Sequence, residues 1–238
     1  MSFQLPPLYL ISDAERVGED RTFETIREAC SGGLSLVQLR EPSWNAERLE
    51  SLARRLLEKV KQEPALVVNC RPGKDFSSRL ELVERLGAGG VHVGGGETGC
   101  VEEVRKILGA GAVIGYSAHS AGEAEQAFAC GANYVSLSPV FTPLSKQGEF
   151  EPLGLDQLSA ACSFLDGPVY ALGGITVDAA ASIRLCGAAG VAVVSALFEA
   201  GDPFRTAGEL AAPWEGGSLA SSRGEGNQGG ADEEEVGT

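Results

Sequence analysis

The sequence is poor in histidine, in long apolar runs and in positive charge. Its 238 residues include two histidines, and no apolar run reaches the roughly 18 residues that a membrane helix needs. The N-terminal stretch lacks the charged and apolar regions of a secretory leader. Nineteen basic residues against 33 acidic ones give a net charge of −14. This charge argues against binding to nucleic acid or to an anionic membrane, so we expect a small-molecule partner.

The six cysteines do not form a C-x-x-C pair. This spacing gives no support for a zinc ribbon or a thioredoxin-like motif. Scattered cysteines are typical of reduced, mostly buried thiols, so we expect a cytoplasmic protein. The sequence leaves open whether it is a homo-oligomer.

Short β-rich runs alternate with helical patterns along most of the chain. Segments 45–62 and 100–109 have the pattern of helices. The runs are apolar on both faces, as in a parallel sheet covered by helices. They lie at 8–12, 34–39, 65–69, 90–94, 112–117, 133–138, 168–173 and 190–195. Eight such units predict a single (β/α)8 TIM barrel over residues 1–213, with an open doubly wound sheet as the alternative.

Two segments depart from this pattern. From Trp214 the chain is rich in Gly, Ser and Glu and has little to bury, which predicts a disordered acidic tail over 214–238. Residues 71–79 form an unusually polar insertion between the third β-rich run and the next helix.

In a TIM barrel the active site lies at the carboxyl ends of the strands. Arg40 and Lys146 would supply positive charge there, Arg as a bidentate anion ligand and Lys as a point charge. The other polar residues expected at this end are Asp13, Gln38, Asn69, Arg71, Glu97, Ser117, His119, Thr142 and Ser145.

The last two strands are expected to end in a phosphate cradle. Gly173 and Gly174 would let the backbone approach a ligand closely, and Thr176 could cap the next helix. Val194 and Ser195 form the corresponding turn after the last strand. Phosphate binding at these turns recurs in TIM barrels. The alternative is that the glycines only permit tight turns.

Each histidine has a functional and a structural interpretation. His119 lies where a strand ends and a helix begins, and an imidazole can exchange protons near neutral pH. However, Ser120 and Glu123 form an S-x-x-E capping box that would explain this junction without catalysis. His92 lies inside a strand, where a structural role is favoured. Cys70 would be reactive only if its position in an electropositive mouth favoured the thiolate.

Several motifs together resemble the thiamine phosphate synthase/TenI superfamily. They are "LYLISD", "LVQLRE", "GVHVG", "GYSAHS", "YVSLSPVFTPLSK", "PLGLDQL", "ALGGIT" and "GVAVVSALF", and the resemblance spans about residues 8 to 205. It implies one of two activities. A synthase joins hydroxymethylpyrimidine diphosphate to a thiazole phosphate with Mg²⁺ and releases pyrophosphate. A TenI-type tautomerase shifts protons to aromatise a thiazole carboxylate phosphate. Both hold the thiazole-side phosphate after the last two strands.

The sequence departs from the synthase pattern at three places. Asn69-Cys70-Arg71 replaces Asn-Asp-Arg, Gly95-Gly96-Glu97 replaces Gln-Glu-Asp, and Arg40-Glu41-Pro42 replaces Arg-Glu-Lys. A neutral thiol is a poor ligand for Mg²⁺, which prefers oxygen. The half of the site that would hold metal and pyrophosphate therefore lacks residues of the synthase pattern. The half that would hold the thiazole phosphate retains them.

These features favour a tautomerase without a cofactor, in which the resemblance makes His119 the proton shuttle, with Ser117 as a second catalytic residue. The first alternative is a synthase with Mg²⁺ held by Glu97, either with or without Asp75 of the insertion. The second is a non-catalytic protein that binds thiazole phosphate or thiamine phosphate. In each case the expected substrate-binding residues are Gln38, Arg40, Asn69, Thr142 and Lys146, and the expected phosphate-binding residues are Gly173, Gly174, Val194 and Ser195.

Overall fold

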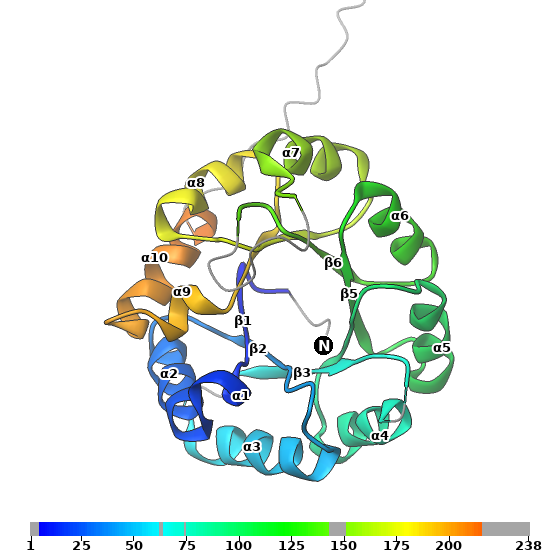
Figure 1. The fold of residues 1–238 in the computed structure, drawn as a ribbon, viewed down its shortest axis with the longest axis vertical. Coiled ribbons are helices and arrows are strands. Elements are labelled where there is room, and N and C mark those ends of the chain that lie inside the picture. Colours follow the sequence, from blue (N-terminus) through cyan, green and yellow to red (C-terminus); the bar gives the residue numbers. More distant parts are fainter. Residues whose placement is uncertain (1–4, 62–63, 74, 143–150, 216–238) are drawn as a thin grey trace, which may run out of the picture.

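The eight strands form one closed parallel barrel in chain order (Figure 1). The structure is a computed structural model that describes residues 5–61, 64–73, 75–142 and 151–215. The strands are β1 (Leu8–Ile11), β2 (Leu36–Leu39), β3 (Ala65–Cys70), β4 (Gly90–Val93), β5 (Val113–Ala118), β6 (Tyr134–Leu137), β7 (Val169–Leu172) and β8 (Gly190–Val193). The predicted TIM barrel is confirmed, and the open-sheet alternative is wrong because β1 pairs with both β2 and β8.

Helices surround the barrel as a ring (Figure 1). They are α1 (Ala14–Val17), α2 (Glu19–Ser31), α3 (Ala46–Lys59), α4 (Phe76–Leu86), α5 (Gly99–Leu108), α6 (Ala121–Ala129), α7 (Gly154–Phe164), α8 (Val177–Leu185), α9 (Ser195–Phe198) and α10 (Pro203–Glu215). The predicted elements differ from these by one to three residues at their ends. The short helices α1 and α9 were not predicted. Neither is long enough to show a helical period. Among the described helices, none is long and apolar enough to cross a membrane.

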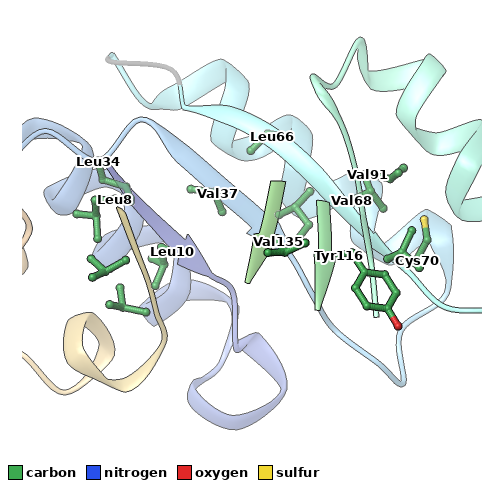
Figure 2. Packing of buried hydrophobic residues seen from close by; sticks show 14 of the residues in the cluster. Leu8, Leu10, Leu34, Val37, Leu66, Val68, Cys70, Val91, Tyr116 and Val135 are labelled. Carbon is green, nitrogen blue, oxygen red and sulfur yellow. The ribbon is translucent and has the colours of Figure 1, made fainter. Parts of the chain in front are cut away.

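Alternate strand residues face two separate apolar clusters. The outward side chains pack against the helices in the larger cluster, part of which Figure 2 shows. The inward side chains fill the barrel with three tyrosines, Tyr9, Tyr134 and Tyr170, whose rings meet edge to face at centroid distances of 5.2 to 6.1 Å. Two inward glycines, Gly115 and Gly190, leave the space that these rings occupy. The barrel interior is therefore filled at its centre by these side chains.

The end of the barrel domain lies slightly beyond the expected boundary at residue 213. Helix α10 continues to Glu215, and Trp214 Nε1 donates a hydrogen bond of 2.9 Å to the carbonyl of Ala188. The expected tail beyond this point, residues 216–238, lies outside the described residues. The insertion at 71–79 is only partly a loop, because residues 76–79 form the first turn of α4.

Replacing Gly115 with alanine should destabilise the barrel. A Cβ at Gly115 would lie 2.2 Å from Tyr134 Cζ and 2.5 Å from His92 Nδ1, so these buried rings would have to move. We expect urea denaturation to show a loss of about 1–3 kcal/mol in the free energy of unfolding, the usual range for overpacking. Gly122→Ala on α6 is the control, because no atom lies within 4 Å of its added Cβ. Equal effects of the two substitutions would contradict this packing.

Candidate functional site

A cavity of about 280 Å³ opens at the carboxyl ends of the strands. It brings together most of the residues predicted for the site, namely Gln38, Arg40, Asn69, Ser117, His119, Gly173, Gly174, Val194 and Ser195. It also contains Arg71, which the sequence placed at this end without assigning it a role. Thr142 and Glu97 are both exposed and do not line the cavity. Lys146 and Ser145 lie outside the described residues.

The predicted phosphate cradle lies at one side of the cavity. Gly173 and Gly174 have φ angles of 95° and 64°, which glycine adopts without strain. A Cβ at either residue would also collide with the loop after β6, at 2.8 Å from Pro139 or from Phe141. The glycines therefore serve the packing of a turn and leave the backbone accessible to a ligand. The predicted side-chain cap is wrong, because Thr176 occupies the N-cap of α8 without a side-chain hydrogen bond.

His119 is held in place by the first turn of α6. Ser120 Oγ accepts a hydrogen bond of 3.2 Å from the Glu123 amide, as the capping box predicts. The Glu123 carboxylate accepts one of 2.8 Å from the amide of His119, one residue before the N-cap. His119 Nδ1 lies 2.9 Å from the carbonyl oxygen of Ser138, which can only accept, so Nδ1 carries a proton. In the neutral ring Nε2 is then the basic nitrogen.

Ser117 lies beside His119 on the cavity wall and contacts the barrel interior below. Its Oγ lies 2.9 Å from His92 Nε2, and His92 Nδ1 lies 3.1 Å from the Tyr134 hydroxyl. Burial lowers the pKa of His92 to about 3, and the positive charge of Arg40 adds to this shift. His92 is therefore neutral at physiological pH, which agrees with the structural role favoured for it.

Two amide side chains form the floor of the cavity near β2 and β3. Asn69 Nδ2 donates a hydrogen bond of 3.3 Å to the His92 carbonyl. Gln38 is almost fully buried, and its Oε1 has no hydrogen-bond partner among the described residues. Because an unpaired buried acceptor is costly, Gln38 is suited to accept an N–H or O–H from a ligand.

Arg40 and Arg71 place two positive charges at the mouth opposite the cradle. Burial lowers the pKa of Arg40, and the charge of Arg71 lowers it further, so the two guanidinium groups lie close enough to repel. Within the described part of the chain, neither forms an ion pair. Arg71 lies across Gly94, where a Cβ would come within 2.5 Å of its Nε. An anion between the two arginines would relieve their repulsion.

The backbone that carries Arg40 is anchored by a buried carboxylate. Glu41 is completely buried, and its Oε1 accepts hydrogen bonds from Ser12 Oγ at 2.6 Å and from the Ala14 amide at 2.8 Å. Its Oε2 accepts one of 2.9 Å from the Glu15 amide. Ser12 Oγ in turn accepts from the Arg40 amide at 2.9 Å. These contacts join the ends of β1 and β2.

A buried guanidinium extends this anchor to β3. Arg79 donates to the carbonyl of Asn69 at 3.1 Å and to those of Glu41 and Trp44 at 2.8 and 2.9 Å. We call Ser12, Glu41 and Arg79 the strand-end frame, because they fix the strand ends that carry Arg40, Asn69 and Arg71. Sequence reasoning missed Arg79, because its position in a polar insertion indicated a solvated side chain.

Among the described residues, the side chains that line the cavity include no carboxylate that could bind magnesium. Cys70 is buried among Val68, Val91 and the apolar residues outside the barrel (Figure 2), and burial raises the pKa of its thiol to about 12. The alternative of a reactive Cys70 is therefore not favoured, and the buried thiol agrees with the structural interpretation of the cysteines. Glu97 and Asp75 are exposed outside the cavity lining. Within the described residues, no group of three or more His, Cys, Asp or Glu side chains could hold a metal ion.

Comparison with known proteins identifies the family to which these features relate. A profile described as "Thiamine monophosphate synthase" (TMP-TENI) matches residues 8–197. A protein of Geobacter sulfurreducens, provisionally named a thiamine-phosphate synthase, is 37% identical over 86% of this chain and 92% of its own length. The thiamine-phosphate synthase of Roseiflexus castenholzii is 35% identical over 82% of each chain.

Comparison with solved structures supports the barrel fold. The chain resembles the thiamine phosphate pyrophosphorylase of Pyrococcus furiosus with a TM-score of 0.69 and 27% identity, over 87% of this chain and 95% of that one. A likeness to the structure titled "Native KDPGal structure" has a TM-score of 0.66 at 18% identity and shows the barrel fold alone.

The buried neutral His92 should make stability depend on pH. Its pKa is about 3 in the folded protein and near 6.5 when unfolded, so the unfolded chain binds more protons between these values. The stability from neutral His92 is complete above about pH 6.5 and is lost as pH falls, by up to about 1.4 kcal/mol per pH unit. In urea denaturation at pH 4 to 7, His92→Gln should show a shallower loss of stability than the unaltered protein. Parallel curves would contradict a neutral buried imidazole.

Removing the guanidinium of the strand-end frame should also destabilise the protein. Arg79→Met removes three hydrogen bonds to buried carbonyl groups, of which only that of Glu41 is known to keep another donor, the Trp44 amide, so we expect the free energy of unfolding to fall by about 3 kcal/mol. Arg85→Met is the matched control on α4, because Arg85 is exposed and pairs with Glu50 at the surface. We expect a change of less than about 1 kcal/mol for this control. A similar small change for Arg79→Met would show that the frame does not anchor the strand ends.

Proposed function

Because the chain belongs to the thiamine monophosphate synthase family, we propose that it is an enzyme of thiamine biosynthesis that acts on a thiazole phosphate in this cavity. The reaction that the site supports best is a proton shift that aromatises a thiazole carboxylate phosphate, as in a TenI-type tautomerase. Such an isomerisation takes a proton from one position of the substrate and returns one at another. It therefore needs no metal and no second substrate.

The observation that carries this proposal is the orientation of His119. Its Nδ1 donates to the Ser138 carbonyl, and the amide of His119 is held by Glu123. A neutral imidazole fixed in this way has its basic nitrogen at Nε2, on a residue that lines the cavity. Because an imidazole exchanges protons near neutral pH, Nε2 is suited to remove and return a substrate proton.

The rest of the cavity supports the same choice of substrate. The cradle of Gly173, Gly174, Val194 and Ser195 would hold the phosphate, through backbone N–H groups at the starts of two helices. Arg40 and Arg71 directly follow β2 and β3, across the cavity from the cradle, and would bind the substrate carboxylate. In this arrangement one substrate with two anionic ends spans the cavity, with its ring beside Ser117 and His119.

The second candidate is thiamine-phosphate synthase activity, which the relatives favour. Curated relatives at 32 to 37% identity carry this name. The two arginines could also bind a pyrophosphate group. Against this candidate, Cys70 has no oxygen ligand for Mg²⁺, and the Glu97 carboxylate does not line the cavity. A protein that binds thiazole phosphate without turnover is the third outcome.

The proposal is tested by ultraviolet absorbance with the unaromatised thiazole carboxylate phosphate in the presence of EDTA. We expect catalysed aromatisation, and a loss of about 100-fold or more in rate for His119→Gln because general acid–base catalysis contributes at least that much. Ser120→Ala is the control, because it removes the helix cap and retains the imidazole. It should lower stability by about 1 kcal/mol and change the rate only slightly.

A parallel assay distinguishes the three candidates. The protein is incubated with hydroxymethylpyrimidine diphosphate, thiazole phosphate and Mg²⁺, and pyrophosphate release is measured. Pyrophosphate release that stops on addition of EDTA, with no aromatisation, would replace the tautomerase by the synthase. Binding of thiazole phosphate without turnover in either assay would identify a binding protein.

A further inference from the structure

Three neighbouring strands contribute a chain of hydrogen bonds that runs from the barrel interior to the cavity. Tyr134 on β6, His92 on β4 and Ser117 on β5 are linked by contacts of 3.1 Å and 2.9 Å through the two nitrogens of the imidazole. Tyr134 and His92 are at most 1% exposed, while Ser117 lines the cavity. We call these three residues the interior hydrogen-bond chain.

The hydrogen bonds of this chain have a preferred direction. Among the described residues, His92 Nδ1 is the partner of the Tyr134 hydroxyl. If Tyr134 donates to Nδ1, the proton of the neutral imidazole lies on Nε2 and is donated to Ser117 Oγ. Each buried donor then has an acceptor. In the opposite direction, Nδ1–H would donate to the phenol oxygen, and the Tyr134 O–H would be buried without an acceptor, which is the costlier arrangement.

We propose that Tyr134 and His92 are positioning residues that make Ser117 a hydrogen-bond donor toward the cavity. Because Ser117 Oγ already accepts from His92, its own proton is directed to a ligand, where it binds an anionic oxygen or an unprotonated ring nitrogen. The identity of that ligand as a thiazole phosphate rests on the proposed function. The direction of the hydrogen bonds in the interior hydrogen-bond chain does not depend on the proposed function.

The packing around the chain prevents these side chains from reorienting. The Tyr134 ring meets Tyr9 and Tyr170 edge to face, at centroid distances of 6.1 Å and 5.5 Å. Gly115 lies against both Tyr134 and His92, where even a methyl group would overlap their ring atoms. Since interior side chains at this density rarely change rotamer, the proton on the imidazole decides whether Ser117 donates or accepts.

The direction is measured by ¹H–¹⁵N correlation spectroscopy on protein labelled with ¹⁵N-histidine. The sequence has two histidines, so His119→Gln assigns both sets of signals. We expect His92 as the Nε2–H tautomer, with no change from pH 5 to 8. An Nδ1–H tautomer for His92 would overturn the proposal, because Ser117 would then donate into the barrel. This measurement does not depend on which ligand the cavity binds.

The consequence for binding is measured by calorimetry with thiazole phosphate in a double-mutant cycle. We expect Ser117→Ala to weaken binding about tenfold, as for loss of one hydrogen bond to an anionic ligand. Tyr134→Phe should weaken it similarly, and the double variant should be no weaker than either single one. Tyr170→Phe is the matched control, because Tyr170 is also an interior tyrosine but donates to the Pro6 carbonyl. It should bind as the unaltered protein does.

The possible failures are distinguishable. Additive effects of Ser117→Ala and Tyr134→Phe, or an equal loss in Tyr170→Phe, would show that Tyr134 acts only through stability and would overturn the positioning role. If the unaltered protein does not bind thiazole phosphate, the proposed function fails. The measured tautomer of His92 would still show in which direction the hydrogen bonds of the interior hydrogen-bond chain run.

Discussion

The site depends on the requirement that polar groups inside a closed barrel find hydrogen-bond partners. A barrel of eight strands has little interior space, and here three tyrosines and a histidine occupy its centre. A polar atom buried there without a partner costs stability, as do Tyr9 Oη and Ser136 Oγ, which have none among the described residues. His92 meets this requirement by contacting Tyr134 on one side and Ser117 on the other. The same contacts that stabilise the interior therefore also orient Ser117, which lines the cavity.

A second buried network fixes the opposite wall in the same way. The strand-end frame, consisting of Ser12, Glu41 and Arg79, contains both an acid and a base, but their hydrogen bonds go mostly to the backbone. It joins the ends of β1, β2 and β3 and holds the backbone of Arg40 and Asn69. The arginine side chains at the mouth therefore extend from a hydrogen-bonded backbone and form no ion pair among the described residues, although the charges of Asp13, Glu41 and Glu15 act on Arg40. This combination suits an anionic ligand.

The fold was predictable from the sequence because the apolar runs alternate so regularly with helical segments. Residues such as Arg40, Ser117 and His119 were found because each lies at the end of a strand or directly after it, and the ends of parallel strands meet at one edge of the barrel. Arg79 was missed because its burial depends on contacts with β3 and with the loop after β2, which no local pattern encodes. The position of Glu97 outside the cavity could not be predicted either, because the three consecutive glycines before it allow many loop paths. The tautomer of His119 required the position of Ser138, which is distant in sequence.

The central claim is that a thiazole phosphate binds with its phosphate in the cradle and its ring beside His119. A crystal structure of the protein with bound thiazole phosphate, grown without added divalent cations, tests it most directly. We expect the phosphate against the backbone of Gly174 and Ser195, and the ring within hydrogen-bond distance of His119 Nε2 and Ser117 Oγ. A phosphate held between Arg40 and Arg71, with the ring away from His119, would contradict the account.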